Sequence, residues 1–272
     1  FMNNKNSITK THCNTIKFLL ILMFSIIITT NSNSAILKIS ASDKNTSFID
    51  AFNKANRGDT ILMSKGTYNI SKFEITKNIA IISNEKAIIN GGNKGTIFII
   101  KHDSVIIQGL KIANTGKSYI DDYAAILSES AKFFKIKNNE FQNCFFGIYL
   151  KKSTDGLVEN NIIRGRAISE ANSGNAIHLW NCKRMKIMNN SVSKHRDGIY
   201  LEFTENSQIQ NNYSYQNLRY GLHFMFSHNT NYVSNTFKHN GAGVAVMFSK
   251  NINMYKNTFV ENKGSASYGL LL

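Results

Sequence analysis

The sequence predicts an all-β fold, a right-handed parallel β-helix built from coils of about 22 residues. Two features of the second half predict it: an asparagine that ends a short apolar strand, and a motif of the Gly-Ile-Tyr-Leu type. From each motif to the next of these asparagines the interval is always fourteen residues, whereas from each asparagine to the next motif it varies between 8 and 15. One side of the repeat is therefore rigid, and one corner accepts insertions.

The repeated asparagine recurs in steps of 22, 29, 22, 23 and 22 residues, at Asn139, Asn161, Asn190, Asn212, Asn235 and Asn257. Leucine-rich repeats share this period, but their leucine consensus is absent. Asparagine tolerates left-handed backbone, and stacked amide side chains can hydrogen-bond to one another. We therefore expect these residues at the corners of successive coils, in a structural role.

The second motif begins at Gly147, Ala176, Gly198, Gly221 and Gly243. Side chains alternate along a strand, so its second and fourth residues share one face. We expect that face to form the core, in a column containing Ile148, Leu150, Ile177, Leu179, Ile199, Leu201, Leu222, Phe224, Val244 and Val246. Phe203, Phe226 and Phe248 are expected to extend this column as an aromatic stack.

The N-terminus, residues 1–34, has the pattern of a secretory signal peptide. Three lysines precede an apolar run at 18–28, and a small polar stretch follows it. The run is shorter than the roughly 20 residues that span a bilayer, so we expect cleavage near Ser34 or Ala35 and a soluble exported protein. The net charge is +15 for the whole chain and +12 after removal of the three lysines. No cluster of basic and aromatic residues marks a nucleic-acid site.

Residues 35–100 are expected to form an N-terminal cap and the first irregular coils. The segment 47–56 reads as a short amphipathic helix, with Ser47 as N-cap, placed before the first strands to cover the open end of the solenoid. Strands are expected around 60–62, 80–82 and 96–100. Regular coils follow at 101–272, and because no terminal cap is evident we expect further coils beyond the end of this chain.

Carboxylates, which carry the chemistry of many polysaccharide-acting β-helices, are sparse here. Asp121 and Asp122 are adjacent and could bind an ion in a loop, whereas Asp155 and Asp197 each precede a glycine and read as turn residues. Cys144 and Cys182 occupy different points of the repeat, so we expect no disulfide. A carbohydrate-active enzyme, a lyase or hydrolase, or a polysaccharide-binding module is the alternative function, and it rests on analogy of fold.

The outward-facing residues of the repeated strand favour a different chemistry. They form two columns, one of Tyr149, His178, Tyr200, His223 and Ala245, the other of Trp180, Glu202, Met225 and Met247. Strands of stacked coils lie about 4.8 Å apart, so His223, Met225 and Met247 can converge on one ion. Thioether and imidazole ligands suit Cu(I). We predict a transient, solvent-reachable copper site there, with His178, Glu202 and His228 as outer members; the alternative is a methionine-rich docking surface.

Four consecutive runs carry a resemblance to a known family. They are Arg196-Asp-Gly-Ile-Tyr-Leu-Glu-Phe, Arg219-Tyr-Gly-Leu-His-Phe-Met-Phe-Ser-His, Gly241-Ala-Gly-Val-Ala-Val-Met-Phe-Ser and Tyr268-Gly-Leu-Leu-Leu. The series closely resembles the NosD family, the periplasmic maturation factors of nitrous oxide reductase. The resemblance is strongest over residues 175–272 and looser toward the N-terminal cap.

The resemblance implies a non-catalytic periplasmic protein that assists assembly of the copper-sulfur centre of nitrous oxide reductase. It implies work with an ABC-type transporter, whose ATPase is NosF and whose membrane subunit is NosY, and copper delivery from the lipoprotein chaperone NosL. Proteins of the NosD family are longer than this chain, which agrees with the expected missing coils. The family provides no motif that fixes copper ligands by position.

Overall fold

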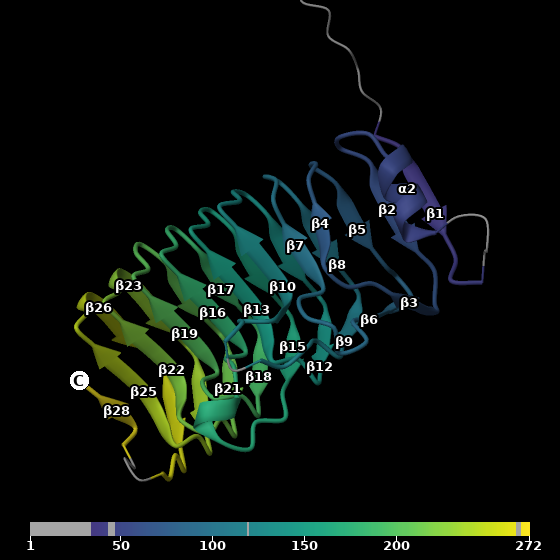
Figure 1. Ribbon diagram of the computed structural model, residues 1–272. Helices are drawn as coiled ribbons and strands as arrows, with labels where there is room; N and C mark the ends of the chain where they lie inside the picture. The colour runs from purple at the N-terminus through teal and green to yellow at the C-terminus, as the bar shows by residue number, and fades with distance from the viewer. Residues whose placement is uncertain (1–33, 43–46, 119, 265–267) are drawn as a thin grey trace, which may run out of the picture. The chain divides into compact units, whose positions relative to one another are not determined.

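The computed structural model describes residues 34–42, 47–118, 120–264 and 268–272. These residues form a solenoid of short parallel strands, in which each complete coil contributes one strand to each of three sheets (Figure 1). Register steps between neighbouring strands run from 20 residues, Thr60 to Ala80, to 29 residues, Ile106 to Lys135. The predicted all-β parallel β-solenoid is confirmed. The predicted signal peptide falls almost wholly on residues outside the described part of the chain.

Three sheets make up the solenoid. Sheet A contains β1 (Ile36–Ile39), β2 (Thr60–Met63), β5 (Ala80–Ile82), β8 (Ile106–Gln108), β11 (Lys135–Lys137), β14 (Leu157–Glu159), β17 (Lys186–Met188), β20 (Gln208–Gln210), β23 (His228–Val233) and β26 (Lys250–Tyr255). Sheet B contains β3 (Thr67–Asn69), β6 (Ile88–Asn90), β9 (Lys111–Ala113), β12 (Glu140–Gln142), β15 (Ile162–Arg164), β18 (Ser191–Ser193), β21 (Tyr213–Tyr215), β24 (Thr236–Lys238) and β27 (Thr258–Val260). Sheet C contains β4 (Phe73–Ile75), β7 (Phe98–Ile100), β10 (Ala124–Glu129), β13 (Phe146–Lys151), β16 (Ile177–Trp180), β19 (Ile199–Glu202), β22 (Tyr220–Met225), β25 (Ala242–Met247) and β28 (Leu270–Leu271).

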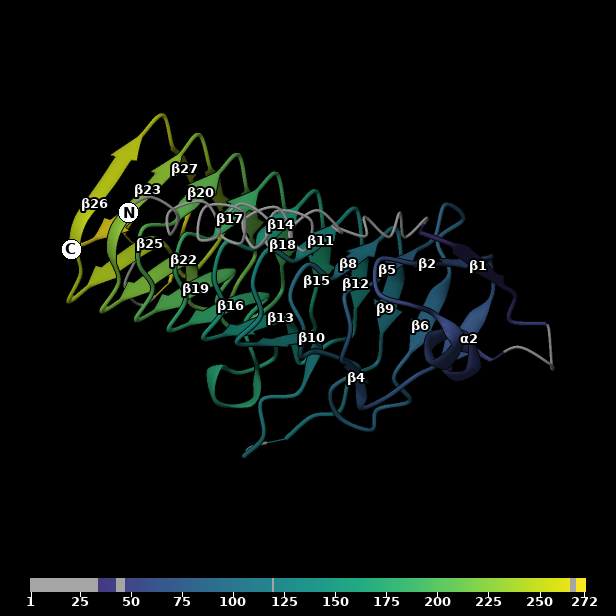
Figure 2. The same ribbon diagram turned by 90° about the horizontal axis from the view of Figure 1, so that it is seen from above.

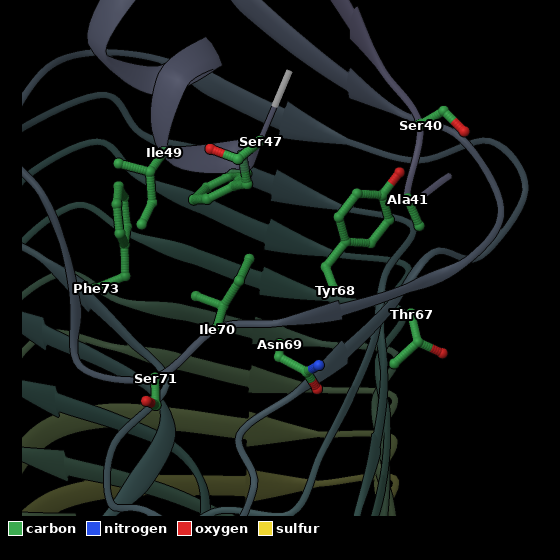
Figure 3. A pocket seen from close by; sticks show the side chains of 11 residues that line it. Ser40, Ala41, Ser47, Ile49, Thr67, Tyr68, Asn69, Ile70, Ser71 and Phe73 are labelled. Atoms are coloured by element: carbon green, nitrogen blue, oxygen red, sulfur yellow. The ribbon is translucent and has the colours of Figure 1, made fainter. Parts of the chain in front are cut away.

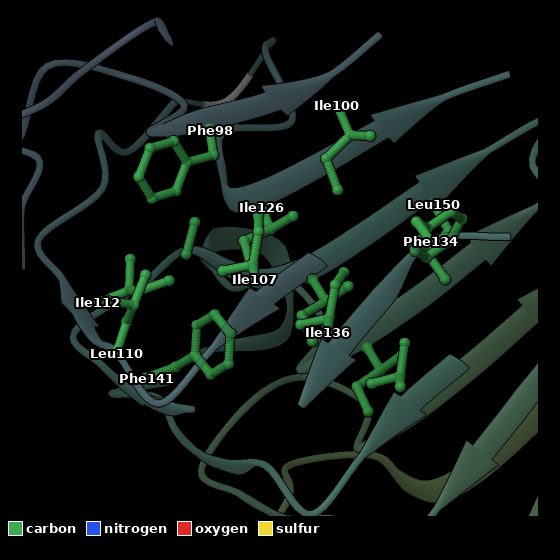
Figure 4. Close-up of a cluster of buried hydrophobic side chains, with 14 of the residues drawn as sticks. Phe98, Ile100, Ile107, Leu110, Ile112, Ile126, Phe134, Ile136, Phe141 and Leu150 are labelled. Atoms are coloured by element: carbon green, nitrogen blue, oxygen red, sulfur yellow. The ribbon is translucent and has the colours of Figure 1, made fainter. Parts of the chain in front are cut away.

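Alternate residues of all three sheets point into one continuous apolar core (Figure 4). The predicted ladder on sheet C is confirmed: Ile177, Ile199, Leu222 and Val244 are paired in register and fully buried. Each coil places its side chains on those of the next, so burial is shared along the whole solenoid.

The repeated asparagines form a ladder at the corner between sheets A and B, buried from Asn139 to Asn235 and half-buried at Asn257. The side-chain amide of each donates to the side-chain oxygen of the next, over 3.1 Å from Asn139 to Asn161 and 3.0 Å from Asn212 to Asn235. The corner position and the stacking are confirmed. The left-handed residue, however, is the one before each ladder asparagine, for example Asn211 at φ 54°. The ladder residue itself turns its amide inward.

The short amphipathic helix is present as α2 (Phe48–Lys54). Ser47 caps it, and Asp50 completes a capping box by accepting from the Ser47 backbone N–H. Phe48 and Phe52 pack on Phe73 with ring centroids 4.9 and 4.8 Å apart, so the helix covers the first coil as predicted. The order of elements differs in one respect, since β1 precedes the helix and pairs with β2.

The three phenylalanines expected to extend the core lie outside it. Phe203, Phe226 and Phe248 are 45%, 40% and 72% exposed, and each has a positive φ close to 50°. Their rings stack on one another at 5.3 and 4.9 Å along the corner between sheets C and A. The turn reverses the alternation of the strand at this residue, so the prediction of a core position was wrong, although the stack itself is present.

Insertions occur where the sequence predicts them, at the corner between sheets B and C. The loop after β15 contains the 3-10 helix η1 (Glu170–Asn172), and Figure 2 shows it projecting on the same side as the loop before β10. Among the described residues, no helix has the length and apolar character needed to cross a bilayer.

Candidate functional site

The outer face of sheet C carries a continuous column of stacked rings. Its members are Phe146, Tyr149, His178, Tyr200 and His223, whose successive ring centroids lie 5.3 Å apart from Phe146 to Tyr149 and then 4.4, 4.7 and 4.5 Å apart. Phe146 and Tyr149 are both on β13, and from Tyr149 onward parallel register places one ring on each coil, directly above the ring before it. Although the column faces away from the core, its residues are buried. Stacking and burial together stabilise this face.

Asp197 lies beside the column and is fully buried, although a turn residue was predicted there. Its carboxylate accepts from the backbone N–H of Tyr220 at 3.2 Å and from Arg219 Nη2 at 3.3 Å. The Nε of Arg196 is 3.7 Å away. Burial alone would raise the pKa of this carboxyl, but the guanidinium groups of Arg219 and Arg196 hold it below its usual value. Asp197 is therefore a buried counter-ion.

His223 contacts this cluster through one ring nitrogen. Its Nδ1 lies 3.0 Å from Arg219 Nη2 and 3.7 Å from Asp197 Oδ2, so the hydrogen bond is to the arginine. Arginine only donates, so Nδ1 accepts, and the proton of the neutral ring is on Nε2. That Nε2 has no hydrogen-bond partner and is buried.

His178 lies one coil before Tyr200, with both ring nitrogens buried and without a hydrogen-bond partner. Its Nε2 is 3.6 Å from a carboxylate oxygen of Glu202. Burial lowers the pKa of His178, against the opposing effect of Glu202. The ring is therefore expected to be neutral at pH 7.

The structure gathers most of the predicted copper ligands on one face. Met225 pairs in register with Met247, Glu202 pairs with Met225, and His223 lies two residues before Met225 on β22. His228 lies apart, on β23 of sheet A, where its Nδ1 accepts from the backbone N–H of Lys250 at 3.0 Å. His223 was expected to be reachable from solvent, but it is only 1% exposed. Over the described residues, no three His, Cys, Asp or Glu side chains meet in a metal-binding group.

Sequence reasoning missed Asp197 as a site residue, together with Arg196 and Arg219. The available signal was the recurrence of arginine two residues before the glycine of two successive motifs, at Arg196-Asp-Gly and Arg219-Tyr-Gly. The backbone N–H of Arg219 donates to the carbonyl of Arg196 at 2.8 Å, so the two residues hold equivalent places on adjacent coils.

Other candidates have structural roles. Asp155 is in a left-handed turn, as predicted, and accepts two hydrogen bonds from Arg184 at 2.8 and 2.7 Å. Asp121 accepts from the Tyr123 hydroxyl at 2.9 Å, and both Asp121 and Asp122 are exposed. Cys144 and Cys182 are buried free thiols, in agreement with the prediction of no disulfide, and burial raises the pKa of each to about 12. Neither thiol is available as a thiolate near pH 7.

A separate hollow of about 370 Å³ lies at the N-terminal end, between α2 and the strands β3 and β4 (Figure 3). Its described lining is apolar or carries hydroxyl and amide groups, among them Ser47, Thr67, Tyr68 and Asn69. The Tyr68 hydroxyl is already used, since it donates toward the carbonyls of Ser64 and Ile39. This lining offers no acid, base or metal ligand, so the outer face of sheet C remains the candidate site.

A second asparagine ladder, at the corner between sheets B and C, ends at a histidine. The backbone N–H of His195 donates to Asn217, which donates in turn to Asn240 at 2.9 Å. His195 is buried, its Nε2 has no partner, and burial lowers its pKa to about 4. The folded protein thus keeps this ring neutral where the unfolded chain, with a pKa near 6.5, binds a proton.

The stability contribution of His195 should therefore be complete above pH 6.5 and lost as the pH falls toward 4. The free energy of unfolding is expected to fall by about 3 kcal/mol over this range because of this group. We expect His195→Asn to flatten the pH dependence of the free energy of unfolding over this range, measured by denaturant titration. The exposed His239→Asn is the control, and an unchanged slope in His195→Asn would contradict this prediction.

Comparison with known proteins agrees with the fold. Residues 123–272 match the family described as right-handed β-helix region, which is more than half of the chain. The chain belongs to this family. The right hand of the coil that the sequence predicts is thereby shown.

The chain is also distantly similar to the probable ABC transporter binding protein NosD of Pseudomonas aeruginosa. The two are 27% identical over 138 residues, which is 50% of this chain and 32% of that protein. A second such protein, from Stutzerimonas stutzeri, is 26% identical over 129 residues, covering 47% of this chain and 30% of that protein. The chain therefore matches about a third of the length of these relatives.

Among solved structures, the surface adhesin PfbA of Streptococcus pneumoniae has a TM-score of 0.65 at 15% identity, over 80% of this chain and 70% of that chain. The polygalacturonase from Erwinia carotovora also has a TM-score of 0.65, at 14% identity, over 84% of this chain and 77% of that chain. At these identities the likeness concerns the fold alone.

Proposed function

We propose that this chain is part of a periplasmic accessory protein of the NosD type, which assists assembly of the copper centre of nitrous oxide reductase together with an ABC-type transporter. The observation that carries the proposal is the 27% identity with the probable ABC transporter binding protein NosD. The partners in this proposal are the transporter subunits NosF and NosY, the chaperone NosL and the reductase itself. The chain acts by binding rather than by catalysis.

The partner surface in this proposal is the outer face of sheet C with the loops at its B-to-C corner. This face presents Trp180, Met225 and Met247, which are only half-buried. The exposed stack of Phe203, Phe226 and Phe248 borders it. Large partly exposed apolar side chains on one face are typical of protein interaction sites.

Crosslinking tests the proposal, with a photo-crosslinker placed at Trp180 and, as a control, at Lys137 on the outer face of sheet A. In cells that express the transporter and the reductase, we expect products with NosY, NosF, NosL or the reductase from position 180 and few from position 137. Crosslinks confined to position 137 would reject this surface. Turnover of a polysaccharide that disappears in Asp121→Asn or Asp122→Asn would instead support the carbohydrate-active alternative.

Within this function we propose that Met225 and Met247 hold a transient Cu(I) ion, with His223 as the imidazole ligand and His178 and Glu202 further out. His228, which lies apart on sheet A, is not part of this site. The paired strands bring the two methionines to about 4.8 Å backbone spacing, and soft thioethers suit Cu(I). Arg219 occupies Nδ1 of His223, so the ring ligates a metal only when that contact breaks, which leaves Nδ1 free to bind the ion or to take over the ring proton from Nε2. Displacement of Arg219 then becomes part of copper loading.

Anaerobic titration with Cu(I) against a competing chelator tests the site. We expect a Met225→Leu, Met247→Leu variant to bind at least tenfold more weakly than the parent, because leucine keeps the volume and removes the sulfur. Met188→Leu, on the outer face of sheet A, is the matched control. Equal affinity in all three proteins would remove this site and leave the assembly function standing.

A further inference from the structure

Unsatisfied polar atoms are concentrated beside the ring column. Over the described residues, eight buried side-chain nitrogen or oxygen atoms lack a hydrogen-bond partner. Six of them belong to one group at the starts of β16, β19 and β22: Asn175 Nδ2, both ring nitrogens of His178, Arg196 Nε, Arg219 Nε and His223 Nε2. Since buried polar groups are normally paired, this concentration requires an explanation.

Most of these atoms are hydrogen-bond donors. Amide and guanidinium nitrogens only donate, and Nε2 of His223 carries the ring proton because Nδ1 accepts from Arg219. The buried carboxylate of Asp197 lies beside them, 3.7 Å from Arg196 Nε and 3.3 Å from Arg219 Nε, and it also accepts from the backbone N–H of Tyr220. The group is short of acceptors, and the part of it that a ligand can reach is the partly exposed guanidinium groups, which would take oxygen atoms.

The two arginines are fixed and partly open to solvent. They stand on adjacent coils, joined by the 2.8 Å backbone hydrogen bond, and their side chains are 29% and 30% exposed. Arg219 is held by Asp197, by His223 and by the ring of Tyr220, 4.7 Å below its guanidinium carbon. In the neighbouring coils the equivalent positions are Gly174 and Gly241, which add no charge.

The two arginines are the groups that suit an anion at this place. Two guanidinium groups face one buried carboxylate, so these three side chains together carry one net positive charge, which the nearby Glu202 offsets. Arginine presents a planar fork that matches two oxygens of one oxyanion, and a fork already held by other contacts loses little entropy when it binds. Glu202 and the exposed Asp122 act on the same face, since both raise the pKa of His178 against its burial, and they limit the affinity.

We infer that Arg196 and Arg219, held in register by the buried Asp197, form a binding site for an oxyanion, a carboxylate or phosphate group with at least two acceptor oxygens. Asp197 positions the pair without contacting the ligand. This inference depends on the geometry of the cluster and is independent of copper binding and of the transporter.

The test follows the Nε–H resonances of both arginines by NMR in the purified protein during titration with acetate or inorganic phosphate, at constant ionic strength. We expect saturable shifts of both resonances, and the stronger of the two anions tells a carboxylate ligand from a phosphate ligand. Arg196→Gln should weaken binding at least tenfold. The exposed Arg164→Gln, on the outer face of sheet B, should keep the parental affinity.

Arg196→Lys is the control for a folding defect, because it retains the charge but removes the planar guanidinium group. This variant should bind the anion more weakly than the parent and should unfold at the same temperature as the parent. Shifts that fail to saturate with either anion would overturn the inference. So would parental affinity in Arg196→Gln, or an equal loss in Arg164→Gln, which would indicate only an effect of total charge.

Discussion

Leu222→Asp is expected to unfold the solenoid or to destabilise it by about 5 kcal/mol or more, since an ionised carboxylate in an apolar core has no partner. Leu222 is fully buried between Ile199 and Val244, its register partners on the adjacent coils. Because each coil packs against the coils on either side of it, the loss of packing at Leu222 should also destabilise both neighbouring coils. Denaturant unfolding, or the yield of soluble protein, measures the effect.

The matched control is Gln208→Asp, which places the same side chain on the exposed outer face of sheet A. It should change the free energy of unfolding by less than about 0.5 kcal/mol, as is usual for surface substitutions. A Leu222→Asp protein that melts like the parent would show that the inward and outward faces of β22 have been assigned wrongly.

Much of the fold could be predicted from the two intervals between motif and asparagine and from the alternation of apolar residues within the motif. The constant spacing of fourteen residues between motif and asparagine reflects a rigid path from sheet C through sheet A to the corner before sheet B. Alternation within the motif then fixed which side chains enter the core, as the burial of Ile177 and Leu179 confirms. The variable interval between each asparagine and the next motif showed that the corner between sheets B and C accepts insertions.

Local predictions failed where the backbone leaves the strand. Alternation cannot be continued through a left-handed residue, and Phe203 lies at φ 50°, so its side chain turns outward. For the same reason the left-handed position at the asparagine corner is Asn211 rather than Asn212. A pattern of residue types marks the corner but does not tell which residue within it reverses the chain.

The candidate site was predicted only in part. The columns on sheet C could be read from the register, so the neighbours His178, Tyr200 and His223 were expected. Burial of Asp197 could not be read in this way, because Arg219, 22 residues later, supplies much of its compensation. An aspartate before a glycine has the same local sequence whether it caps a turn or anchors two arginines. Long-range pairing of charges decides between the two.

Because the asparagine ladder is buried, substitution of one of its members should give the second large loss of stability. Asn212 accepts from the backbone N–H and the side-chain amide of Asn190, both at 3.0 Å, and donates to the carbonyl of Ile187 at 2.8 Å. Asn212→Leu would remove these three buried hydrogen bonds, although the Asn190 amide keeps its bond to the Val158 carbonyl, at an expected cost of about 4 kcal/mol. Asn253→Ala is the matched control, since Asn253 donates to Asn231 at 2.9 Å in the same cross-coil manner but on the exposed face of sheet A, and it should cost less than about 0.5 kcal/mol. Denaturant titration of both variants measures the difference, and equal losses would mean that stacking of amides, rather than their burial, stabilises the corner.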